Sequence, residues 1–515
     1  MTVGLVVAVL GGLLVPLYWL TLAPHATWAN LGTDSGELIA VAVVRGVPHP
    51  TGYPTYLLLL HLLDLLPLPI PNTAPALRYG LLSVLSATAT AMGIALAVLR
   101  LPPPSILPLA RPLLLGVAIL TALSYATTAL VWSQAVIVEV YSLHTLWVVL
   151  LILLLPQPPR WWHGLVIGLA LGHHRTSLLL ILVWVAVQLA RRTPLAVWVR
   201  VLAGVAGGLL VYLLLPLRAA SVPPINWGNA ATWDGFWWLV QARYFQGFVQ
   251  LPSLSAALER MHTLGLLGLS QFGVLLGLAG YGSVRGGRLP AWGLGLPAFV
   301  ALQVSFTLIY TSTDWQVHLL PVWVVVAIWV GWGAVGLLHA LARPAPQSAR
   351  WLAAGGGMVW VGVLLLGASQ TLPQVDGRRD TRAIAFADAV WAAAPAGAII
   401  YAGSDQDIFA LWYGHYALAA RPDVAVIAEP LIVYAWYRQA LREQYAWLHV
   451  PTGADDSRAW AQWLAELRSL NPHAPHCRTR LAGAQVVQCG DDVGNPTQNT
   501  QATANPIWPI TAHTR

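Results

Sequence analysis

The segment Thr33–Tyr56, TDSGELIAVAVVRGVPHPTGYPTY, gathers residue types that acid–base chemistry needs, in a chain that otherwise avoids charge. Asp34 and Glu37 stand three residues apart at the start of an apolar helix expected over residues 38–44. This spacing is typical of a capping box, in which Asp34 caps the helix and Glu37 reaches back to it. A carboxylate at the membrane surface can also act as a general base. Both interpretations stay open, since a capped carboxylate is rigidly aimed.

The stretch PHPTGYP that follows cannot be helical, because Pro48, Pro50 and Pro54 fix an extended path. We expect this path to pin the preceding helix and to place His49 and Tyr53 beside it. The alternative is a plain turn, although a turn needs fewer prolines.

The composition of the chain indicates whether these residues lie in a soluble or a membrane protein. The 515 residues are 57% hydrophobic and only 9% charged, with a mean hydropathy of +0.64. Soluble proteins average about 25% charged residues, so the chain is expected to be a polytopic membrane protein. The net charge of +7 does not indicate nucleic-acid binding, because the arginines are scattered among apolar segments.

Apolar runs predict about eleven transmembrane helices. They cover residues 3–22, 76–99, 113–131, 138–155, 162–172, 176–190, 196–216, 263–281, 291–310, 318–341 and 351–370. The first lacks the basic start and cleavage site of a signal peptide, so we expect it to be retained. The run 55–66 is too short and is expected to be an interfacial or re-entrant helix.

Loop charges predict the orientation of the chain. If the first helix runs outward, the loops on the inner side contain arginines and no acidic residue, as the positive-inside rule requires. The acidic residues then lie outside: Asp34, Glu37, Asp64, Glu139, Asp234, Glu259 and Asp314. We therefore expect a plasma-membrane protein with a cytoplasmic N-terminus.

A change in composition near residue 371 predicts three regions. Residues 1–370 form the transmembrane domain. Residues 371–490 form an extracytoplasmic α/β domain with short parallel strands in AIIYAG (398–403) and VAVIAE (424–429). Residues 491–515 are rich in Asn, Thr and Pro and are expected to be disordered. Cys477 and Cys489 are predicted to form a disulfide, since their spacing suits a hairpin outside the cytoplasm.

The segment from Thr33 resembles the signature of the protein O-mannosyltransferase-like family of membrane proteins, among the glycosyltransferases of the GT-C type. The likeness continues at WSQAVIVEVYSLH (132–144), GLALGHHRTSLLL (168–180), LPLRAASVPPINWGN (215–229) and in the tail from residue 395. The resemblance implies that a monosaccharide passes with inversion from a polyprenyl phosphate to an acceptor hydroxyl on the outer face. Mannose is the sugar by analogy, and protein O-mannosylation the implied process. It maps the catalytic aspartate to Asp34 and matches Glu37 to a nearby glutamate.

A leaving phosphate gains charge, so cationic side chains should lie near it. The candidates are Arg175 with His174, Arg218 and Arg78, although each could also be a structural arginine at a helix end. Glu139 either pairs structurally or touches the sugar. Trp227 belongs to an aromatic belt or to a platform for sugar or lipid. No metal-ligand set is visible beyond Asp34 and Glu37, so the sequence leaves a divalent metal open.

Two other functions fit the same composition. A transporter or flippase of lipid-linked saccharides would carry acidic residues through the span interiors and show repeat symmetry, and neither is evident. A non-catalytic scaffold with an outer receptor domain would not need the Asp34 segment. The partners expected are the lipid bilayer, a polyprenyl-phosphate sugar donor and a protein or glycan acceptor.

Overall fold

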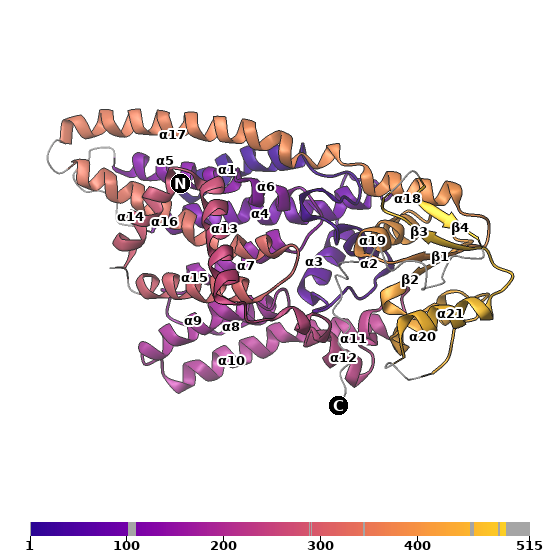
Figure 1. The fold of residues 1–515 in the computed structure, drawn as a ribbon. Helices are drawn as coiled ribbons and strands as arrows, with labels where there is room; N and C mark the ends of the chain where they lie inside the picture. Colours follow the sequence, from indigo (N-terminus) through magenta and orange to yellow (C-terminus); the bar gives the residue numbers. More distant parts are fainter. Residues whose placement is uncertain are drawn as a thin grey trace. The chain divides into compact units, whose positions relative to one another are not determined.

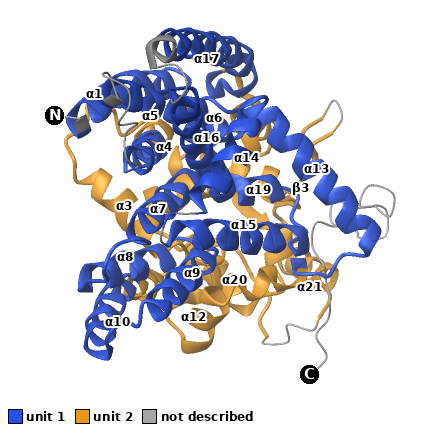
Figure 2. Ribbon diagram, turned by 90° about the vertical axis from the view of Figure 1, so that its left-hand side faces the viewer, with its two compact units in different colours: residues 1–23, 79–211, 248–378 blue, residues 24–78, 212–247, 379–515 orange. Residues whose placement is uncertain are grey.

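A computed structural model describes residues 2–100, 110–287, 289, 291–342, 346–453, 458–482 and 485–490. The tail predicted to be disordered, 491–515, lies outside the described residues. The chain divides into two compact units (Figure 2). Unit 1 comprises residues 1–23, 79–211 and 248–378, and unit 2 comprises residues 24–78, 212–247 and 379–515.

Unit 1 is helical. Its helices are α1 (Thr2–Trp19), α4 (Pro75–Leu99, which starts in unit 2), α5 (Ala110–Ala126), α6 (Ala129–Ala135), α7 (Tyr141–Leu154), α8 (Trp161–Leu171), α9 (Ser177–Ala190), α10 (Leu195–Leu209), α13 (Leu254–Phe272), α14 (Leu275–Gly286), α15 (Trp292–Ile309), α16 (Leu320–Ala342) and α17 (Pro346–Val375). The sequence of α16 is apolar on all sides, and most of its residues are buried in the core of this unit, as expected for a central helix. The break predicted at GHHRT is present, because α8 ends at Leu171 and α9 begins at Ser177.

The predicted count of eleven spans is not confirmed. Among the described residues, five helical segments are long and apolar enough to cross a membrane, and seven if each of two bent pairs is one span. The bends are 74° between α5 and α6 and 105° between α13 and α14. Several predicted spans fold instead as apolar helices of 10–17 residues, α7, α8 and α9 among them. Hydropathy measures the length of an apolar run but not where its helix breaks.

Unit 2 contains a four-stranded sheet. Its strands are β1 (Ile399–Ala402), β2 (Ala425–Ala428), β3 (His476–Thr479) and β4 (Val487–Cys489), in the order β2-β1-β3-β4 (Figure 1). β1 pairs in parallel with β2 and β3, and β4 is antiparallel to β3. The two predicted strands, in 398–403 and 424–429, are β1 and β2. Cys477 and Cys489 face each other across β3 and β4 and are joined by a disulfide.

The helices of unit 2 come from three stretches of the chain. They are α2 (Ser35–Val44), α3 (Pro54–Asp64), α11 (Leu214–Ala219), α12 (Trp233–Val240), α18 (Arg382–Ala393), α19 (Asp405–Trp412), α20 (Ala435–Gln444) and α21 (Trp460–Leu470). The short helix expected over 55–66 is α3. One hydrophobic cluster includes Val41 of α2, Ile225 and Ile400 of β1. The compact unit therefore extends beyond the predicted 371–490 segment and buries part of the Asp34 segment, Thr33–Tyr56, in the same core as the sheet.

The contact between α2 and α19 positions the Asp34 segment. Gly36, in the first turn of α2, lies directly against the backbone carbonyl of Phe409 in α19. A methyl group at Gly36 would overlap that carbonyl, and a backbone atom cannot turn aside as a side chain can.

We expect Gly36→Ala to lower the thermal unfolding midpoint of the detergent-solubilised protein, although Ala stabilises an ordinary helix interior by about 1 kcal/mol relative to Gly. Gly356→Ala is the matched control, since nothing lies within 4 Å of a Cβ built at Gly356 in α17. The control should leave the midpoint unchanged or raise it. Equal midpoints for both variants would contradict the packing described here.

Candidate functional site

The capping box expected at the start of α2 is not formed. Asp34 occupies the N-cap position, but its side chain accepts no capping hydrogen bond. The Glu37 carboxylate turns instead to His49: one oxygen accepts the backbone N–H of His49 at 3.0 Å, and the other makes a short contact with Nδ1. The spacing in DSGE therefore lets Glu37 bind His49 of the extended segment rather than cap the N-terminus of α2.

Asp34 and Glu37 differ sharply in their access to solvent. The Glu37 side chain is fully buried, whereas 34% of the Asp34 side chain is exposed. The Nε2 atom of His49 lies 3.8 Å from Asp34 Oδ2 and 3.2 Å from the Tyr53 hydroxyl. His49 thus joins the buried carboxylate to the accessible one, and only Asp34 can meet an incoming substrate without a rearrangement.

Backbone geometry fixes the position of His49. The N–H of Val47 donates to the Ile225 carbonyl at 2.9 Å, and the N–H of Trp227 donates to the Val47 carbonyl at 3.2 Å. After His49, the chain turns through Gly52 with φ of +79°, a conformation that favours glycine. The predicted non-helical path of PHPTGYP is therefore attached to a second loop that contains the predicted residue Trp227.

An aromatic wall adjoins His49, which we define as Trp227, Trp238, Tyr244 and Trp436. The Trp227 ring lies edge-on to the His49 imidazole with centroids 6.3 Å apart. Trp227 also contacts Tyr244 at 5.6 Å and Trp436 at 6.0 Å. Among the described residues, the indole Nε1 atoms of Trp227 and Trp436 are buried and have no hydrogen-bond partner. Trp436 comes from α20, and this contribution was not predicted from the sequence.

A third acidic residue, Asp405, approaches this site from the first turn of α19. The indole of Trp28 donates to the carbonyl of Gln406 at 3.1 Å and so holds this turn against the segment before Asp34. Burial, and then the charge of Asp34, raise the pKa of Asp405 to about 8. Asp405 is half-buried, so part of it remains at the surface.

No motif in the sequence marks Asp405 as a site residue. Ser404 is the N-cap residue of α19 and forms a capping box with Asp407, whose Oδ1 accepts from the backbone N–H and the hydroxyl of Ser404, both at 2.7 Å. Its position just after β1 could have identified Asp405 as a candidate, because α/β sheets bind ligands at the carboxyl ends of their parallel strands.

The segment before Asp34 is anchored by Asp380. Its Oδ2 atom accepts from the Thr27 hydroxyl at 2.6 Å and from the backbone N–H groups of Trp28 and Ala29 at 2.9 and 2.7 Å. The hydrogen bond from Arg382 and these donors hold the pKa of Asp380 well below its usual range, although burial opposes them. An ionised Asp380 therefore ties residues 27–29 to the start of α18.

Comparisons with known proteins bear on this arrangement. The family described as Protein O-mannosyl-transferase TMEM260 N-terminal domain matches residues 34–197, starting at Asp34. The mouse Protein O-mannosyl-transferase TMEM260 is 26% identical over 459 residues, which cover 82% of this chain and 62% of that protein. The crystal structure of ArnT from Cupriavidus metallidurans bound to undecaprenyl phosphate matches with a TM-score of 0.55 and 14% identity, over 93% of each chain.

The chain is similar to the O-mannosyltransferase-like membrane proteins, and its fold resembles that of ArnT. The family resemblance drawn from the sequence is thereby confirmed, and the likeness to ArnT shows the fold. The chain spans 62% of the length of the mouse relative, so the activity of that whole protein does not transfer by alignment alone.

Two predicted phosphate ligands of this O-mannosyltransferase-like protein have other contacts. Arg218 is buried and donates to the carbonyls of Gly46 at 3.2 Å and Leu57 at 3.4 Å. Arg78 is buried and donates to the carbonyl of Ile70 at 2.9 Å. These contacts favour a structural role for both arginines, in which they hold the extended segment and α3 in place.

The remaining predicted residues lie in unit 1. The Thr176 hydroxyl contacts His174 Nδ1 at 2.7 Å and His144 Nε2 at 2.9 Å, and the two imidazoles stack 4.3 Å apart. Arg175 is exposed beside this pair. Glu139 is buried, and its Oε2 accepts the N–H of Val140 at 3.0 Å. Within the described part of the chain, no group of three or more His, Cys, Asp or Glu residues is arranged to hold a metal ion.

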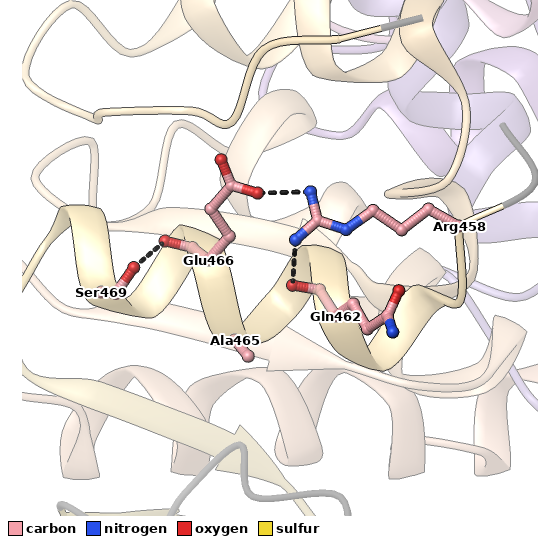
Figure 3. A pocket seen from close by; sticks show the side chains of 5 residues that line it. All are labelled: Arg458, Gln462, Ala465, Glu466 and Ser469. Atoms are coloured by element: carbon pink, nitrogen blue, oxygen red, sulfur yellow. Dashed lines mark hydrogen bonds and ion pairs between the residues drawn. The ribbon is translucent and has the colours of Figure 1, made fainter. Parts of the chain in front are cut away.

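A surface hollow on unit 2 contains none of these residues. It is lined by Arg458, Gln462, Ala465, Glu466 and Ser469, on and beside α21 (Figure 3). Arg458 forms an ion pair with Glu466 and donates to the Gln462 carbonyl at 3.3 Å (Figure 3). The charges that line the hollow are therefore already paired with each other.

We expect Glu37→Ala to lower the free energy of unfolding by about 3 kcal/mol, because it leaves the buried His49 N–H and imidazole without their acceptor. Glu37→Gln should cost less, since an amide oxygen can still accept the backbone N–H. Denaturant titration of the purified protein measures both. Glu443→Gln, an exposed change in α20, should have no effect, and a Glu37→Ala protein as stable as this control would disprove the anchoring role.

Proposed function

We propose that this chain is an inverting glycosyltransferase. It moves a monosaccharide, mannose by analogy, from a polyprenyl-phosphate donor to an acceptor hydroxyl on the outer membrane face. The observation that carries the proposal is the accessible Asp34 carboxylate held beside the buried Glu37–His49 pair. The printed names of the relatives support it, since one is a protein O-mannosyl-transferase and the other was crystallised with undecaprenyl phosphate.

Asp34 is the proposed general base. As the acceptor oxygen forms its bond to the anomeric carbon, its proton passes to Asp34, and the bond from that carbon to the phosphate oxygen breaks. The electron pair leaves with the phosphate. A hydroxyl is a weak nucleophile until a base takes its proton, and a single displacement inverts the anomeric carbon.

Glu37 takes a different part from the one the sequence suggested. It is fully buried and bonded to His49, so it orients the imidazole and does not meet the acceptor. His49 and Tyr53 in turn limit where the Asp34 carboxylate can point. Binding groups held in place before the reaction lower its barrier by restricting misaligned approaches.

The donor phosphate needs cationic groups, and Arg175 is the proposed one. Its guanidinium is exposed, whereas Arg78 and Arg218 are buried and donate to carbonyl groups. His174 is held by Thr176 and is proposed to support the segment that carries Arg175. Arginine suits this task because its planar fork can bind two phosphate oxygens.

The aromatic wall is proposed to receive the sugar or the acceptor. Aromatic faces pack against the apolar faces of sugars, and this is the contact proposed for the wall. The acceptor is proposed to be a protein or a glycan. The orientation proposed from the loop charges, with the N-terminus in the cytoplasm and the Asp34 site outside the plasma membrane, places this site where polyprenyl-linked sugars are used.

The test supplies purified protein in nanodiscs with a panel of polyprenyl-phosphate sugars and candidate acceptors. We expect Asp34→Asn to lower turnover at least about 100-fold, the usual effect of removing a general base, while donor binding and the unfolding midpoint stay unchanged. Asp234→Asn is the matched control, because Asp234 is exposed in the first turn of α12, and it should keep wild-type turnover.

Equal turnover of Asp34→Asn and the wild type would reject the proposal. Movement of a lipid-linked saccharide across the bilayer, without sugar transfer, would point instead to a flippase. Activity with one donor of the panel would also name the sugar.

A further inference from the structure

We infer that Asp405, supplied by α19, is a positioning residue of the Asp34 site: it holds a proton there, so that Asp34 stays the ionised carboxylate. This inference rests on the proposed function, and nothing in the family resemblance or in the relatives' names assigns Asp405 a role. It makes the C-terminal part of the chain a contributor to the reaction rather than an accessory to it.

The packing of α19 brings Asp405 to the site. Gly36 lies against the Phe409 carbonyl, so the two helices approach at backbone distance. The bond from the Trp28 indole to Gln406 fixes the residue next to Asp405. The helix also contributes Ile408 and Phe409 to the core shared with α2. Asp405 therefore cannot swing away without breaking buried contacts.

The charges around Asp405 are mostly of its own sign. It interacts with the carboxylates of Asp34 and Glu37 on α2 and of Asp407 on its own helix, and with one imidazole, His49. Tyr244 of the aromatic wall also interacts with Asp405. Glu37 is already bonded to His49, so this imidazole cannot compensate every acid.

A crowded set of acids settles by keeping one of them neutral. Asp34 is one-third exposed and lies near His49, which favours its charged form. Burial and the acids around Asp405, Asp34 first among them, raise the pKa of Asp405. The pair then divides the work: Asp34 takes the proton of the acceptor hydroxyl, and Asp405 donates a hydrogen bond without losing its own proton.

A phosphate donor strengthens this division. A polyprenyl-phosphate sugar brings one more negative charge, which disfavours ionisation of any acid near it. An ionised Asp405 would repel the donor and the leaving phosphate, whereas a neutral carboxylic acid can donate a hydrogen bond to either. The proposed role is therefore lost when pH rises far enough to ionise Asp405.

The experiment compares the pH dependence of sugar transfer from undecaprenyl-phosphate mannose, or from whichever donor of the panel is active, between pH 6 and pH 10. For the wild type we expect transfer to fall about tenfold from pH 7 to pH 9, since a group with a pKa near 8 keeps about a tenth of its protons at pH 9. Asp405→Asn is neutral at every pH and keeps a donor. It should retain at least about a third of wild-type activity at pH 7 and should lose less than about twofold by pH 9.

Asp388→Asn, an exposed change in α18, is the control and should follow the wild-type profile. Asp405→Ser keeps a neutral donor in a smaller side chain and should show the same flat profile if the Asn variant unfolds. An Asp405→Asn protein that is folded but inactive at all pH values, or that keeps the wild-type fall, would overturn the inference. Failure of the proposed function is seen separately, as unchanged transfer by Asp34→Asn.

Discussion

A buried carboxylate must be paired, and the pairing of Glu37 with His49 organises the rest of the site. Leaving a charge buried without a partner costs several kcal/mol, so α2 and the extended segment after it have to keep the register that brings these two residues together. That register leaves Asp34 at the solvent-facing end of α2. It also points the second nitrogen of His49 toward Asp34 and Tyr53. The buried contact between Glu37 and His49 thus determines the solvent exposure and the orientation of Asp34, the proposed base.

The Asp34 segment shares a core with the α/β layer for a related reason. Ten residues of helix α2 are too few to be stable alone, because short helices depend on packing for their stability. In this chain the packing comes from α19 and from the cluster that includes Val41 and Ile400. Asp380 adds a second attachment by collecting three donors from residues 27–29. The C-terminal sheet is therefore part of the support on which the Asp34 segment rests.

In unit 1 several buried polar side chains also have hydrogen-bond partners. A single hydroxyl, that of Thr176, contacts two stacked imidazoles, and Glu139 bonds to the N–H of the next residue. Polar side chains among apolar helices are costly unless such partners exist. The break between α8 and α9 that exposes Arg175 follows from this cluster, since the residues that turn the chain are the ones that make these contacts.

The sequence by itself determined the membrane class, the resemblance to the O-mannosyltransferase-like family, the two parallel strands, the helix break at residues 172–176 and the cysteine pair. Each depends on local signals: apolar runs, short motifs, or the alternation of strand and helix. It also singled out Asp34, because a carboxylate beside a proline-rich segment is unusual in a chain with so little charge. The count of eleven membrane helices is not confirmed, since apolar runs do not reveal where a helix bends or stops short.

Only the tertiary structure decided which partner each charged residue takes. The spacing of Asp34 and Glu37 fits a capping box equally well, and the choice of His49 over the helix end depends on the Val47–Trp227 pairing with a segment nearly 180 residues away. Arg218 and Arg78 are predicted as phosphate ligands from the sequence, and only the folded chain shows that they donate to carbonyl groups. Asp405 lies 371 positions after Asp34, and no local pattern links them. Long-range packing brings such residues together, so their chemistry could be assigned only from the folded chain.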